Sequence, residues 1–252
     1  MIFSLTLAAQ VAPPNGAGVS MGHFHIVTAD PESQKKLWVD ALGGKLVTAG
    51  PLEYAMFPGV LVGYRRGDSS GGTDGSVVDH LGFAVRDAAA TKAKLIAAGA
   101  QIVREMPEAR QFFAMFPGGV KVEFIEDAAM DVPVKHHHLH YAAHQVEEMR
   151  AWYAKVFGAV PGMRGKFKAA DLPGVNLSWN SAEQPAAPTK GRSLDHVGLE
   201  VKDIKAFCAK LEAGGIKLDM PPTLRADLGL TIAFLTDPWG TRIELTEGLT
   251  RY

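Results

Sequence analysis

Histidine is the residue type in this sequence best placed to carry metal or acid–base chemistry, because nine histidines accompany a single cysteine, Cys208. One cysteine cannot form an internal disulfide or a cysteine-based zinc cluster. Any metal site must therefore use nitrogen and oxygen ligands. Four of the histidines, His23, His80, His138 and His196, stand 57, 58 and 58 residues apart. This regular spacing predicts an internal repeat.

Two glutamates hold corresponding places near the ends of the second and fourth repeats. Glu123 and Glu244 each follow a tight turn that contains proline and glycine, in a short strand of alternating polarity. Because side chains of a strand alternate between its faces, Glu123 shares a face with Lys121, and Glu244 with Arg242. The apolar residues between them are expected to point to the core.

Each of the four histidines opens the same kind of segment: a strand, a helix, and then two or three short strands. The expected helices begin at Asp30, Asp87 and Asp203, whose side chains can cap a helix, whereas Gln145 is a weaker start in the third repeat. Repeats one and three end alike, as do repeats two and four. The sequence thus predicts an α+β fold of four modules, arranged as two tandem domains of two consecutive modules each.

A β-α-β-β-β module used in pairs, with a histidine on its first strand and a glutamate on its last, resembles the vicinal oxygen chelate superfamily. That superfamily includes glyoxalases, bleomycin- and fosfomycin-resistance proteins and extradiol dioxygenases. The resemblance covers residues 21–248 and implies four βαβββ modules paired into two glyoxalase-like half-barrel domains. Domain 1 would comprise residues 21–127 (modules 1 and 2), and domain 2 residues 134–248 (modules 3 and 4).

Carried over by position, the resemblance implies two His-His-Glu sites for a divalent metal ion such as Fe, Mn, Ni or Zn. The implied ligands are His23, His80 and Glu123 in domain 1, and His138, His196 and Glu244 in domain 2. A facial set of two imidazoles and one carboxylate leaves coordination positions open for water or substrate. Whether one domain or both would hold metal stays open at this point.

Two further histidines, His25 and His140, follow His23 and His138 by two positions. Strand alternation places each of them on the same face as the expected ligand, about 7 Å along the strand. Beside a bound metal they would act as acid–base groups or contact the substrate. The alternative is that they are polar residues lining a wet cleft.

Departures from the family's patterns reduce the number of reactions that the site could catalyse. Glyoxalase I uses a second glutamate from the last strand of the first module, but this chain has Leu61-Val62-Gly63 there, and Asn176-Leu177-Ser178 in the second half. Extradiol dioxygenases place a tyrosine about ten residues before the ligand glutamate, where this chain has Phe113 and Phe234. A four-ligand glyoxalase site and an extradiol-type dioxygenase are therefore both disfavoured.

The remaining prediction is a metalloprotein that uses a His-His-Glu divalent metal as a Lewis acid on a small oxygen-bearing substrate, in a lyase or isomerase reaction. The alternative is a non-catalytic protein of the bleomycin-resistance type that binds and sequesters a small molecule. Both functions require an open cleft, but only the enzyme requires stoichiometric metal.

The composition excludes several other classes of protein. The 252 residues are 47% hydrophobic and carry a formal net charge of -1, so that the chain is not intrinsically disordered. No cluster of lysine and arginine predicts a nucleic-acid partner, and no apolar run after the N-terminus approaches the length of a membrane span. The expected partner is a small-molecule substrate, and a monomer suffices because both domains belong to one chain.

Residues 1–20 are expected to be a secretory signal or a disordered tail in front of domain 1. The apolar stretch 2–9 is typical of a signal peptide, but no lysine or arginine precedes Lys35, so that the usual positive region is missing. A signal would direct the protein to the periplasm or the exterior, whereas a tail would leave it in the cytoplasm.

Overall fold

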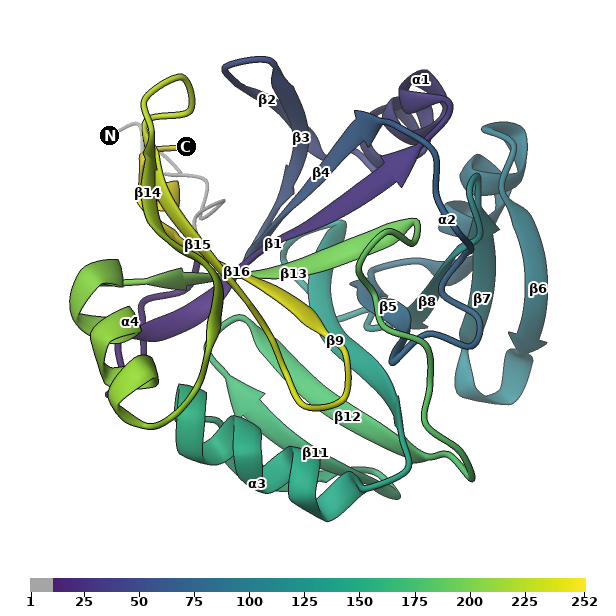
Figure 1. Cartoon of the computed structure of the whole chain (residues 1–252). Helices are drawn as coiled ribbons and strands as arrows, with labels where there is room; N and C mark the ends of the chain where they lie inside the picture. Colours follow the sequence, from purple (N-terminus) through teal and green to yellow (C-terminus); the bar gives the residue numbers. More distant parts are fainter. Residues whose placement is uncertain (1–10) are drawn as a thin grey trace, which may run out of the picture.

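The computed structural model describes residues 11–252 and contains four copies of one β-α-β-β-β module (Figure 1). Module 1 comprises β1 (Val19–Thr28), α1 (Pro31–Lys35) with a following π-helical turn η1 (Lys36–Ala41), β2 (Lys45–Ala49), β3 (Leu52–Phe57) and β4 (Val60–Arg66). Module 2 comprises β5 (Val78–Val85), α2 (Ala88–Ala97), β6 (Gln101–Met106), the 3-10 helix η2 (Pro107–Ala109), β7 (Gln111–Phe116) and β8 (Val120–Glu126).

The second half of the chain repeats this order. Module 3 comprises β9 (Val134–Ala143), α3 (Val146–Phe157), β10 (Val160–Arg164), β11 (Phe167–Leu172) and β12 (Val175–Ser181). Module 4 comprises β13 (Leu194–Val201), α4 (Ile204–Ala213), β14 (Leu218–Arg225), β15 (Leu230–Thr236) and β16 (Arg242–Glu247), followed by the 3-10 helix η3 (Leu249–Arg251). The predicted α+β class and the four modules are confirmed.

The helix starts follow the sequence signals. The side chains of Asp30, Asp87 and Asp203 each accept a hydrogen bond from the backbone N–H three residues later, which is the bond of an N-terminal cap. Gln145 makes no such bond at the start of α3. The constant distance from histidine to cap therefore fixes how each first strand connects to its helix.

The modules do not pair in chain order. β1 runs antiparallel to β13, and β5 runs antiparallel to β9. One sheet therefore has the order β14-β15-β16-β13-β1-β4-β3-β2, and the other has the order β10-β11-β12-β9-β5-β8-β7-β6. The prediction that residues 21–127 form one half-barrel and residues 134–248 the other is wrong, because modules 1 and 4 share one sheet and modules 2 and 3 share the other.

The short link between modules 2 and 3 explains this pairing. Only the seven residues Asp127–Pro133 separate the end of β8 from the start of β9. β9 lies two strand positions from β8, with β5 between them, and neighbouring strands are about 4.8 Å apart. A seven-residue link spans that step easily, and modules 1 and 4 then complete the second sheet.

One hydrophobic core joins the two sheets, since a single buried cluster draws residues from all four modules. Trp38 of module 1 packs on Phe83 and Phe116 of module 2, with ring centroids 5.4 and 4.9 Å apart. Modules 1 and 2 therefore pack against each other through the core, although they belong to different sheets. Within residues 11–252 no helix is long and apolar enough to cross a membrane.

The segment before β1 is part of the fold. Val11 is buried, and the Asn15 side chain donates hydrogen bonds to the carbonyl oxygens of Phe157 and Gly158 at the end of α3, at 2.9 and 3.2 Å. The expectation of a disordered tail is wrong for residues 11–20, because these bonds and the start of β1 at Val19 hold them in place. Residues 1–10, which include the signal-like stretch, lie outside the described residues.

Candidate metal centres

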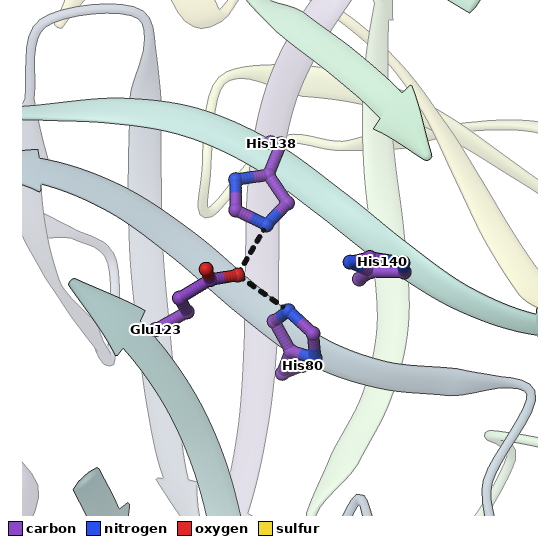
Figure 2. A group of neighbouring side chains, drawn as sticks. All are labelled: His80, Glu123, His138 and His140. Carbon is purple, nitrogen blue, oxygen red and sulfur yellow. Dashed lines mark hydrogen bonds and ion pairs between the residues drawn. The ribbon is translucent and has the colours of Figure 1, made fainter. Parts of the chain in front are cut away.

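The six expected ligands come together in two groups, one on each sheet. The His80 site consists of His80 on β5, Glu123 on β8 and His138 on β9 (Figure 2). The His196 site consists of His196 on β13, Glu244 on β16 and His23 on β1. The predicted ligand sets are each wrong in one member, since His23 and His138 are exchanged. The cause is the sheet pairing, which places β9 beside β5 and β1 beside β13.

In the His80 site one carboxylate oxygen lies between two imidazoles, as Figure 2 shows. Glu123 Oε2 is 2.8 Å from His80 Nε2 and 2.9 Å from His138 Nε2. All three side chains are buried, and with His140 they form a group whose ligand atoms lie within 4.8 Å of one another. The His196 site is looser on one side, with Glu244 Oε2 at 2.8 Å from His196 Nε2 and 3.4 Å from His23 Nε2.

The His80 site fits a divalent cation. His138 Nε2 is buried and near the carboxylate, but it is not aligned for a hydrogen bond, and no other residue in 11–252 bonds to it. A buried polar nitrogen without a partner is costly. A cation held by His80, His138 and Glu123 would satisfy this nitrogen with the ligand types that transition metals prefer.

A glycine makes room for one imidazole in each site. Gly82 pairs with His138 across β5 and β9, and a Cβ atom at Gly82 would lie 2.0 Å from ring atoms of His138. Gly198 stands in the same relation to His23, also at 2.0 Å. Neither glycine was predicted as a site residue from the sequence. Their signal was a glycine two residues after the first histidine of modules 2 and 4.

An aspartate orients the other imidazole in each site. Asp79 Oδ1 is 2.5 Å from His80 Nδ1, and Asp195 Oδ1 is 2.7 Å from His196 Nδ1. Adjacent residues of a regular strand point to opposite faces, but the strand register shifts at both positions, and such a bulge re-aims side chains. The aspartate holds the proton on Nδ1 and leaves Nε2 to face the carboxylate. The Asp-His dipeptides were the sequence signal, and they were overlooked.

The protonation states of the His80 site also suit metal binding. Burial lowers the pKa of His138 well below 6.5. For Glu123, burial opposes the charge, but the adjacent imidazoles of His138 and His80 outweigh it and hold the pKa of the carboxyl far below its usual value. At His80, burial is likewise outweighed by hydrogen bonds to Asp79 and Glu123, which raise its pKa. A cation would displace the proton of His80 and find the other two ligands already deprotonated.

The two predicted acid–base candidates lie beside the ligands. The ring centroid of His140 is 4.6 Å from that of His80, and the centroid of His25 is 4.9 Å from that of His196. Burial, with the nearby His80, lowers the pKa of His140 to about 3. Burial, with the nearby His196, holds the pKa of His25 well below its usual value. Both rings are therefore neutral near pH 7.

The two sites differ in the space in front of them. The His80 site lines a cavity of about 570 Å³, whereas the cavity at the His196 site has about 310 Å³. The smaller cavity is bordered by a separate apolar cluster that includes Tyr54, Leu228, Leu230, Phe234 and Leu249. The larger cavity carries the cationic side chains of Arg104, Lys121, Arg164 and Lys166.

Arg164, at the end of β10, is a site residue that the sequence analysis did not find. Its Nε donates to Ser178 Oγ at 2.8 Å, and its Nη2 lies 3.2 Å from His140 Nδ1. By strand register, module 1 has Ala49 where module 3 has Arg164, and Gly63 where module 3 has Ser178. No sequence motif marks Arg164, which has the appearance of an ordinary edge-strand arginine.

These features define a class of protein: paired βαβββ modules that bring two histidines and a glutamate together on each sheet. Residues 135–245 match the model of the Glyoxalase/Bleomycin resistance protein/Dioxygenase superfamily. The match covers most of modules 3 and 4, and modules 1 and 2 repeat the same order of elements.

Solved structures show the same fold over nearly the whole chain. Glyoxalase I from Zea mays is 19% identical with a TM-score of 0.71, over 91% of this chain and 92% of that chain. A putative dioxygenase from Bacillus subtilis is 13% identical with a TM-score of 0.66, over 94% and 86%. At these identities the likeness is one of fold. No curated protein matches the sequence.

Proposed function

We propose that the protein is an enzyme of the lyase or isomerase type that uses a divalent metal at the His80 site as a Lewis acid on a small oxygen-bearing substrate. The observation that carries this proposal is the convergence of His80, Glu123 and His138 on one buried point beside a cavity of about 570 Å³. A cavity of this size is within the range for small-molecule sites.

The residues of the chain have distinct tasks in this proposal. A bound divalent cation would polarise a substrate oxygen and stabilise the negative charge that develops on it. His80, Glu123 and His138 would hold the cation, and Asp79 orients His80 through the Nδ1 contact of 2.5 Å. His140 supplies a neutral imidazole within reach of the same point.

The choice of the His80 site over the His196 site follows from access. Each site contains two histidines and one glutamate, but the His196 site faces the smaller cavity, which an apolar cluster borders. Each half-barrel is completed by modules of the same chain. The proposal therefore requires no partner subunit, and a monomer is the expected active form.

Ring cleavage of the extradiol type has less support. At the position of the family's tyrosine stands Phe113, whose ring edge packs on His80 with centroids 5.2 Å apart. A phenyl ring can confine a substrate, but it has no hydroxyl group to donate a hydrogen bond. The site therefore supports Lewis-acid chemistry better than dioxygen chemistry that depends on this hydroxyl.

Metal content tests the proposal against the alternative of a sequestering protein. Protein purified without a histidine tag is analysed for metal before and after incubation with Fe(II), Mn(II), Ni(II) or Zn(II). We expect stoichiometric binding that Glu123→Ala lowers, with Glu244→Ala as the matched change in the other half. Less than about a tenth of an equivalent under all conditions would contradict the enzyme and leave sequestration as the function.

A further inference from the structure

The positively charged guanidinium of Arg164 faces the His80 cavity. Its guanidinium bonds to two neutral groups, Ser178 Oγ and His140 Nδ1, and no ion pair among residues 11–252 includes it. Lys121, on the same cavity, is by contrast neutralised by Asp74 and Asp79, at 2.6 and 2.9 Å. A half-buried guanidinium without a counterion is a ready site for an anion.

Arg164 also determines which nitrogen of His140 carries the proton. A guanidinium can only donate, so that His140 Nδ1 must accept and the neutral ring must carry its proton on Nε2. His140 Nε2 is buried, and within residues 11–252 nothing accepts its hydrogen. His140 therefore offers a free N–H donor toward the site rather than a lone pair for metal.

We propose that Arg164 and His140 together bind a carboxylate of the substrate, next to the oxygens that the metal takes. The planar guanidinium matches a carboxylate, and an additional N–H from an imidazole completes the donor set. The inference rests on the proposed function for the metal, but the anion site itself needs only residues of the chain.

The rest of the cavity indicates what the carboxylate is attached to. Its lining includes the rings of Phe113 and Phe167 and the apolar side chains of Val103, Met106 and Ile125. Such walls favour an aromatic or branched apolar body. The substrate class is therefore a small apolar or aromatic carboxylic acid with further oxygen atoms close to the carboxylate.

The His196 cavity has no counterpart of the Arg164–His140 pair among residues 11–252. Its register positions hold Ala49 and Gly63, and the arginines facing it are mostly paired: Arg225 binds Asp227 at 2.7 Å and Arg242 binds Asp195 at 2.5 Å. The remaining one, Arg65, is exposed. Carboxylate binding is thus expected in one half of the molecule.

Calorimetric titration with benzoate, and with benzamide as its neutral counterpart, tests the proposal on the full chain with and without Zn(II). We expect wild type to prefer benzoate by about tenfold or more, because hydrogen bonds to charged groups are the stronger ones. Arg164→Gln should abolish the preference and leave metal content unchanged, whereas Lys166→Gln, a cation of the same cavity, should keep it. Arg164→Lys should retain part of it.

Nitrogen NMR of the histidine rings gives a second measurement, independent of affinity. The His140 signal should show the Nε2–H tautomer in wild type and lose that bias in Arg164→Gln. An unchanged benzoate preference in Arg164→Gln, or one that disappears when metal is removed from wild type, would overturn the proposal. A preference that persists in protein that binds no metal at all would instead refute the metal-dependent function and leave the anion site standing.

Discussion

The His80 and His196 sites have matching ligands and matching supports but different surroundings. In each site one imidazole lies over a glycine, Gly82 or Gly198, and the other is oriented by an aspartate. In front of the His80 site is a large cavity with a free guanidinium, and in front of the His196 site is an apolar cluster. The comparison teaches that the arrangement of two histidines and a glutamate repeats in both halves, whereas the side chains around it differ between them.

Tyr54 is central to this difference. Its ring lies edge-on to His23 and His25, with centroids 6.4 Å away in both cases, and covers Gly63 so closely that a Cβ there would lie 2.6 Å from Cε1. The matching position in module 3 is Ala169, which leaves space for Ser178 and Arg164. The small Ala169 thus leaves room in the His80 cavity, whereas the large Tyr54 at the matching position narrows the His196 cavity.

The largest expected effect comes from the glycine under the imidazole. Gly82→Ala would push the His138 ring out of place, and we expect metal affinity at the His80 site to fall by more than about a hundredfold, beyond the loss seen for supporting residues. Gly198→Ala is the matched change at His23 and should leave that affinity intact. Both should cost about 1–3 kcal/mol of stability through overpacking. Titration against a competing chelator, with thermal unfolding, measures both effects, and equal metal loss in the two variants would contradict the comparison.

The sequence predicted the modules and placed the six candidate ligands on their strands, but it did not predict which of these residues meet. Spacing, capping aspartates and strand alternation are local signals, and they placed His80, Glu123 and His138 on the correct strands and faces. The pairing of β5 with β9 is a long-range choice that these signals do not contain. The short link Asp127–Pro133 was the one feature that favoured it.

Arg164 and the cavities lay beyond the sequence for a different reason. The role of Arg164 depends on contacts with residues 14 and 24 positions away, and on the small residue at position 169 of the neighbouring strand. None of these carries a motif. Properties that arise from packing between strands become visible only when the register is known.

A smaller effect is expected from the orienting aspartates. Asp79→Asn removes the charge that holds His80 and pairs with Lys121, and metal affinity at the His80 site should fall by about ten- to a hundredfold. Asp195→Asn should have no effect there. Metal titration of both variants measures this difference in affinity at the His80 site. If Asp79→Asn bound metal as wild type does, orientation by the aspartate would be refuted.

The smallest effect concerns stability in the His196 half. Glu200 accepts hydrogen bonds from the backbone N–H groups of Gly248 and Leu249, and burial raises its pKa to about 7. The folded state therefore holds the proton more tightly than the unfolded state, and stability is lost as pH rises from about 4.5 through about 7. The matching residue in module 2 is Ala84, so that the effect belongs to one half.

Glu200→Gln isolates this effect. Between pH 5 and 8, wild type should lose about 2–3 kcal/mol of unfolding free energy relative to the variant. Urea unfolding at the two pH values measures the difference, since contributions common to both proteins cancel. Parallel pH profiles for the two proteins would show that Glu200 titrates normally.

Proton relaxation of benzoate by protein-bound Mn(II) tests most directly whether metal and ligand meet in the His80 cavity. Relaxation falls with the sixth power of the distance between proton and ion, so the ring protons relax strongly only when the acid binds near the bound Mn(II), and the measurement does not depend on turnover. Wild type and Glu244→Ala are predicted to show strong relaxation, and Glu123→Ala is predicted to lose it. Loss of relaxation in Glu244→Ala, with Glu123→Ala unaffected, would place the chemistry in the other half-barrel and contradict the account.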